Sequence, residues 1–191
     1  MKTIALDNST YAKLSGIKDY LSRQRGKSIS FSEVLEEVLK RPFMLQTIDP
    51  ILREMLEDVL AKLSEKNEIL GIVLFGSMAK SSFVPESDID LFIIVSKRTA
   101  DIFEFVESSI RKTEITFFNK LSDNNLPVYI SPMICDSSEI DTFRPIFLDV
   151  ADFGVILYEK PPIVSRFMEK YISLDHERRF TESGEMVSWK I

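Results

Sequence analysis

The chain has 191 residues, 45% of them hydrophobic, with a formal net charge of −6 and a pI of about 5.0. This length and composition allow one sizeable core, or one medium domain with a small appendage. The net negative charge gives no sign of a nucleic-acid partner for the chain as a whole, and only a local basic patch could bind one.

The single cysteine, Cys135, excludes an intramolecular disulfide framework and fits a reducing compartment. It lies beside an apolar run, so we interpret it as a small buried hydrophobe. The N-terminal MKTIALDNST lacks the apolar segment of a secretory signal, and no apolar run approaches membrane-spanning length. These features predict a soluble, cytoplasmic protein with no membrane partner.

The first part of the chain, residues 1–43, has the pattern of a small β-α-α unit. KTIALD alternates like a short strand, and apolar spacing over residues 10–25 predicts a helix. A second helix is predicted over 31–40, where Ser30 and Glu33 form a capping box at its start. Such short elements bury little surface alone, so the strand is expected to pair with its copy in a second chain.

This pattern resembles the ribbon-helix-helix family of small dimeric DNA-binding domains found in many antitoxins and repressors. The resemblance implies a homodimer formed through the N-terminal strand, and it admits DNA as a partner. Arg23, Arg25 and Lys27 are the candidate contacts to the phosphate backbone. The outward strand positions offer few bonds to base edges, and Asp7 repels phosphate, so dimerisation alone or a protein partner is an equal alternative.

The second part, residues 47–191, alternates helices and strands, which predicts an α/β fold with helices packed on a sheet. Helices are expected over residues 50–66, 99–121, 138–149 and 163–174. Strands are expected over residues 69–75, 88–95 and 128–135, with a short strand or helix end at 155–158 and an edge strand at 186–191.

The stretch FGSMAKSSFVPESDIDLFIIV, residues 75–95, concentrates the chemistry between two apolar strands. Gly76 allows a sharp turn and a close approach of the backbone to a ligand. Ser77 can donate a hydrogen bond to an oxyanion, and the backbone amides of the turn after it suit a phosphate. Lys80 adds a cation one turn later. The turn is therefore predicted to bind phosphate.

Two acids stand at the start of the second strand. Asp88 and Asp90 are two positions apart, so their side chains share one face of the strand. Neighbouring carboxylates repel each other unless a cation lies between them. Mg²⁺ takes such oxygen ligands, bridges to phosphates and lowers the pKa of an attacking hydroxyl. The pair is therefore predicted to bind a divalent metal that carries a triphosphate.

Gly76-Ser77 followed after ten residues by Asp88-Ile89-Asp90, between two apolar strands, resembles the polymerase-beta-like nucleotidyltransferase superfamily. The chain length is similar to its minimal branch, and VYISPMI with FLDVADFGVILYEKPP looks like a prokaryotic, archaeal-like subset. The resemblance implies a mixed sheet flanked by helices. It also implies that Gly76 and Ser77, with Lys80, hold the nucleotide phosphates while Asp88 and Asp90 bind one or two Mg²⁺ ions.

The same resemblance implies the reaction. A nucleoside monophosphate, expected to be AMP, would be transferred from a nucleoside triphosphate to an acceptor hydroxyl, with release of pyrophosphate. Minimal members are often paired with a helical toxin in toxin–antitoxin systems, where the transferase adds AMP to the toxin. A partner protein is therefore an expected acceptor.

The third strand departs from the family pattern. Active members present a third carboxylate there, but LPVYISPMICD has no acid before Asp136, which is the candidate substitute as a further metal ligand. Without that group, transfer could be slower or lost. The alternative function is a DNA-binding, antitoxin-like regulator whose nucleotide-binding domain is catalytically weakened.

Overall fold

The structure is a computed structural model, and the chain divides into two compact units, Met1–Thr47 and Ile48–Ile191. The residues that the structure describes are 27–40, 48–80, 82–174, 176–181 and 184–189, together with Tyr11, Leu14 and Lys18.

The first unit contains α2 (Phe31–Lys40). Its predicted capping box is confirmed: the Ser30 amide donates to the Glu33 carboxylate at 2.7 Å, and the Glu33 amide donates to the Ser30 hydroxyl at 3.1 Å. Leu14, Ile29 and Val34 are buried together. The predicted N-terminal strand, Arg23 and Arg25 lie outside the described residues, so the ribbon-helix-helix arrangement stays a prediction.

The second unit is built on a four-stranded sheet of order β3-β2-β1-β4. β1 pairs antiparallel with β2 and with β4, while β2 pairs parallel with β3. The predicted mixed sheet flanked by helices is confirmed for this unit. The bounds are β1 (Ile69–Phe75), β2 (Ile89–Val95), β3 (Ile130–Asp136) and β4 (Val155–Glu159).

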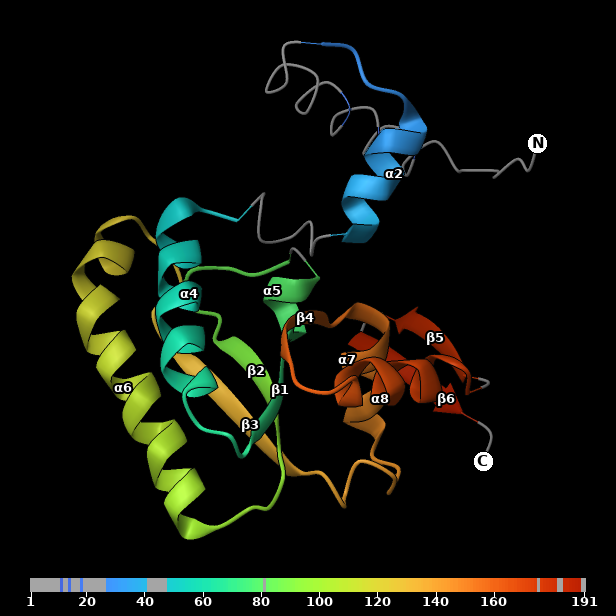
Figure 1. The fold of residues 1–191 in the computed structure, drawn as a ribbon. Coiled ribbons are helices and arrows are strands. Elements are labelled where there is room, and N and C mark those ends of the chain that lie inside the picture. Colours follow the sequence, from blue (N-terminus) through green and yellow to red (C-terminus); the bar gives the residue numbers. More distant parts are fainter. Residues whose placement is uncertain are drawn as a thin grey trace. The chain divides into compact units, whose positions relative to one another are not determined.

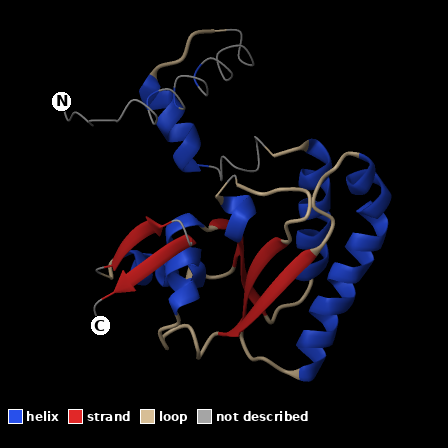
Figure 2. Ribbon diagram, turned by 180° about the vertical axis from the view of Figure 1, so that it is seen from behind, coloured by secondary structure: helices blue, strands red, loops and turns tan. Residues whose placement is uncertain are grey.

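Helices cover both faces of this sheet, with α4 and α6 on one side and α7 and α8 on the other (Figures 1 and 2). This explains why β1 and β2 are continuous apolar runs rather than alternating ones. Val73, Phe92 and Ile94 point into the core cluster on the α7–α8 side. The bounds are α4 (Pro50–Ser64), α6 (Ala100–Asp123), α7 (Pro145–Phe153) and α8 (Ile163–Ile172).

Two sequence predictions need correction. Residues 138–149 do not form one helix, because α7 begins only at Pro145, a residue that suits a first helical turn. The expected edge strand is β6 (Gly184–Trp189), which pairs antiparallel with β5 (His176–Thr181) in a separate two-stranded sheet. HERRFT has no apolar alternation, so sequence reasoning missed β5.

None of the helices that the structure describes is both long enough and apolar enough to span a bilayer.

Candidate active site

The predicted Gly-Ser turn follows β1 directly and forms the short helix α5 (Gly76–Ala79). Gly76 has φ +69°, a conformation that favours glycine. A Cβ placed on Gly76 would collide with the Asp90 carboxylate, so the turn and this acid are in close contact. The register, which pairs Phe75 with Asp90, brings them together. Gly76 is thus required both for the turn and for the space that Asp90 occupies.

Asp90 lies in β2, and Asp88 lies just before it. Asp90 alternates with Phe92 and Ile94, so its side chain projects on the α7–α8 side of the sheet, beyond the end of the core. Asp90 is half-buried, whereas Asp88 is exposed. Burial raises the pKa of the Asp90 carboxyl above its usual range, and the charges of Asp88 and Asp149 raise it further. The surroundings of Asp90 therefore favour the binding of a cation.

This shift predicts an order of titration. In a carboxyl NMR titration, Asp90 should take up its proton at a higher pH than an ordinary aspartate, and Asp136 should do so at about 2. Because a metal binds the ionised carboxylate, metal-dependent activity should fall as the pH drops through the raised pKa of Asp90. An Asp90 resonance that titrates with the exposed aspartates would contradict this prediction.

Lys80 ends α5, and its amide donates to the Gly76 carbonyl at 3.2 Å. Its ammonium is 2.6 Å from the Asp149 carboxylate of α7 and 4.8 Å from the centre of the Phe153 ring. Sequence reasoning placed Lys80 near the turn but gave Asp149 no role. Only the packing of α7 against α5 brings this carboxylate to the site, and no spacing in the sequence signals it.

β3 supplies no acid at the site. Asp90 pairs in register with Ser131, an exposed residue, and parallel neighbours in register project to the same face. Ser131 therefore lies beside Asp90 at the position where a strand-borne third carboxylate would stand.

Asp136 does not replace that acid, contrary to the prediction. It pairs with Val95, at the opposite end of β2 from Asp90. Five residues of strand span about 16 Å. Asp136 instead organises the turn after β3, accepting hydrogen bonds from the Ser138 amide at 2.9 Å and the Arg98 amide at 2.8 Å. These hydrogen bonds lower its pKa to about 2.

The donor set at Asp88 and Asp90 fits Mg²⁺, because this ion is commonly held by one or two carboxylates together with water and substrate phosphates. Throughout the described part of the chain, no three His, Cys, Asp or Glu side chains gather into a self-sufficient metal site. A metal bound here would depend on the nucleotide for its remaining ligands, as is usual where Mg²⁺ carries a triphosphate.

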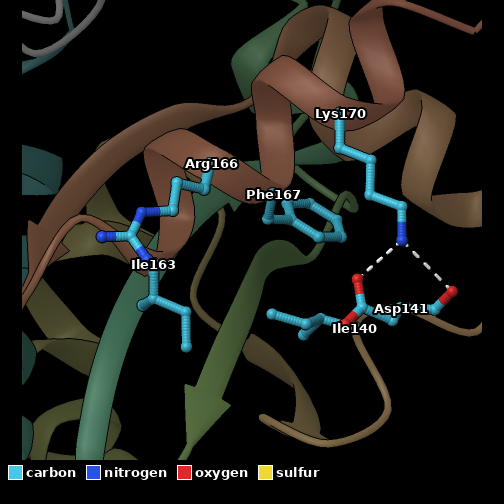
Figure 3. A pocket seen from close by; sticks show the side chains of 6 residues that line it. All are labelled: Ile140, Asp141, Ile163, Arg166, Phe167 and Lys170. Carbon is cyan, nitrogen blue, oxygen red and sulfur yellow. Dashed lines mark hydrogen bonds and ion pairs between the residues drawn. The ribbon is translucent and has the colours of Figure 1, made fainter.

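A pocket of about 370 Å³ lies elsewhere, between α8 and the turn that follows β3 (Figure 3). Lys170 closes one side by pairing with Asp141 at 2.7 Å. Asp141 follows the end of β3 that carries Asp136, away from Asp90, so this pocket is separate from the acid pair. Its lining residues are Ile140, Asp141, Ile163, Arg166, Phe167 and Lys170.

Comparison with known proteins agrees with this geometry. Residues 57–133 match the family model described as polymerase beta, nucleotidyltransferase, a match that runs from α4 into β3 and includes the turn and both acids. The chain contains a polymerase-beta nucleotidyltransferase domain. It is a domain of the enzyme class that the Gly76-Ser77 and Asp88-Ile89-Asp90 motifs predicted.

Similarity to this nucleotidyltransferase domain extends to individual proteins. A protein of Methanocaldococcus jannaschii, named as a protein adenylyltransferase, is 22% identical over 148 residues, which cover 75% of this chain and 96% of that protein. A toxin–antitoxin crystal structure with AMP-PNP is 17% identical, with 62% and 84% of the two chains covered and a TM-score of 0.41. A complex of a tri-AMPylated Shewanella oneidensis HEPN toxin with its MNT antitoxin is also 17% identical, with 63% and 83% covered and a TM-score of 0.36.

Proposed function

We propose that the protein is a Mg²⁺-dependent nucleotidyltransferase that moves AMP from ATP to a hydroxyl group of a partner protein. The observation that supports this proposal is the contact between the Gly76 turn and the Asp90 carboxylate within the nucleotidyltransferase domain. It brings the turn that we propose to bind phosphate next to the acids that we propose to bind the metal. Gly76 and Ser77 would bind the phosphates, Lys80 would offset their charge, and Asp88 with Asp90 would hold the metal.

The acceptor hydroxyl oxygen forms a bond to the α-phosphorus, the bond from that phosphorus to the β-bridging oxygen breaks, and pyrophosphate leaves. Bound Mg²⁺ would supply charge neutralisation and lower the pKa of the attacking hydroxyl. Ser131 cannot act as a carboxylate base, so the hydroxyl proton would pass to solvent. Ser77 and Lys80 would orient the triphosphate for in-line attack.

AMP and a protein acceptor are supported by the name of the M. jannaschii relative, which the chain matches over nearly its whole length. A helical toxin as that acceptor, encoded beside this chain, is the more specific expectation that follows from the family resemblance. The test is incubation of the full chain with α-labelled ATP, Mg²⁺ and the product of the neighbouring reading frame. Label on that protein supports the proposal, and no transfer to it, with pyrophosphate release also absent, would refute it.

A second candidate is the antitoxin-like DNA-binding regulator, and one observation favours it: the β3 residue in register with Asp90 is Ser131 and not an acid. Lys27 is exposed and available for phosphate contacts. A mobility shift on the DNA upstream of the gene, weakened by salt and by Arg25→Ala with Lys27→Ala, is the expected result for this function. Unchanged mobility at low salt would exclude it, and a monomer in sedimentation would exclude the dimer.

A further inference from the structure

The backbone of α5 connects Lys80 to the acid pair. Its amide donates to the Gly76 carbonyl, and Gly76 lies against the Asp90 carboxylate. The Lys80 side chain leaves this short helix in the direction of α7, where its ammonium meets Asp149 at 2.6 Å. The position of the ammonium relative to the turn is therefore set by α7 as much as by α5.

α7 holds the ammonium on two sides. Asp149 and Phe153 are four residues apart, so they share a face of the helix. The ring of Phe153 lies 4.8 Å from the ammonium and adds a cation–π contact to the ion pair. The side chains of Lys80 and Asp149 are only 27% and 18% exposed, so solvent and salt screen this pair less than a surface pair.

We propose that Asp149 is a positioning residue that holds Lys80 in the place where its ammonium meets the triphosphate. The inference rests on the proposed function. A lysine carries three donors on a flexible four-carbon stem, so a carboxylate can fix its orientation while the same ammonium donates to a phosphate. Protein kinases use a lysine–glutamate ion pair between two elements for this purpose.

The competing explanation is that the pair only fastens α5 to α7. A double-mutant cycle detects any contribution of Asp149 to analogue binding that does not pass through Lys80, and thermal unfolding detects a purely structural role of the pair. A positioning residue acts through Lys80. Removing the Asp149 carboxylate should therefore not weaken analogue binding further once Lys80 has lost its charge. An independent electrostatic contribution of Asp149 would still be measured in the absence of the ammonium. A pair that only fastens α5 to α7 would instead lower the melting temperature of Lys80→Met and Asp149→Asn alike and leave analogue binding by the folded protein unchanged.

The experiment measures binding of a non-hydrolysable ATP analogue with Mg²⁺, and kcat and KM for transfer, in the full chain. Lys80→Met and Asp149→Asn are each expected to weaken analogue binding about tenfold, as for loss of a charged hydrogen bond. Lys80→Met/Asp149→Asn should bind no worse than Lys80→Met, and Asp149→Glu should recover part of the loss. Additive losses in the double variant, or wild-type binding by Asp149→Asn, would overturn the proposal.

Lys170 and Asp141 provide a matched control, because they form the same type of pair at 2.7 Å beside the separate pocket (Figure 3). Lys170→Met and Asp141→Asn should leave analogue binding unchanged. Thermal unfolding of every variant separates misfolding from lost binding. The outcome is also separable from the proposed function: if Asp90→Asn abolishes transfer while Asp149→Asn binds normally, only the role of Asp149 is refuted.

Discussion

Replacing Asp90 with asparagine is expected to reduce nucleotidyl transfer by roughly a thousandfold, the upper range for removal of one group that stabilises transition-state charge. Asparagine keeps the size of the side chain and its contact with the Gly76 turn but removes the charge that attracts the metal. Asp90 is central because it lies between that turn and β3, with Asp88 beside it. The measurement is the rate of label transfer from α-labelled ATP over a range of Mg²⁺ concentrations.

The stability of Asp90→Asn distinguishes lost chemistry from lost folding. The pKa of Asp90 is raised in the folded protein, so its ionised form is disfavoured by folding at neutral pH. Removing that charge should leave the melting temperature equal or higher. Asp136→Asn is the control, because Asp136 lies at the far end of the sheet, and its transfer rate should match that of the wild type. An active Asp90→Asn variant would contradict the metal-binding role of Asp90.

Much of the fold could be predicted because β1 and β2 are buried on both faces. ILGIVLF is apolar throughout, and IDLFIIV is apolar except for Asp90, so both segments predict central strands. The acids at the start of the second strand stand out against this apolar background. The Gly76 turn was predictable for a related reason, since glycine after a buried strand indicates a sharp change of direction. These local signals located the turn that we propose to bind phosphate, and the acid pair.

The remaining parts of the site depend on register and on contacts between distant segments. Asp136 was the acid nearest to β3 in the sequence, but the parallel pairing of β2 with β3 places it beside Val95. Asp149 belongs to the site through the packing of α7 on α5, which no periodicity in the sequence indicates. Asp136 was predicted because it is close to β3 along the chain. It lies at the end of β3, however, and β3 runs parallel to β2, so Asp136 is far from Asp90 at the start of β2.

The register also identifies the position at which a carboxylate would complete the acid set. Ser131→Asp is expected to increase the transfer rate by up to about a hundredfold, the lower range for general-base catalysis. Ser131 and Asp90 are in register on adjacent parallel strands, so their Cα atoms lie about 5 Å apart and their side chains project to the same face. Ser131 is exposed, so the new carboxylate would not have to be buried.

Ser131→Asn is the matched control, with nearly the same shape and no charge, and it should not exceed the wild-type rate. The added charge would raise the pKa of Asp90 further, so the gain of Ser131→Asp should be largest at alkaline pH and should decline toward acid pH. Asp90→Asn/Ser131→Asp should show no gain, because the new carboxylate can act only on a nucleotide that the acid pair already holds. If Ser131→Asp is no faster than Ser131→Asn at any pH, the domain does not lack a base at this position, and the weakened-catalysis explanation of Ser131 is wrong.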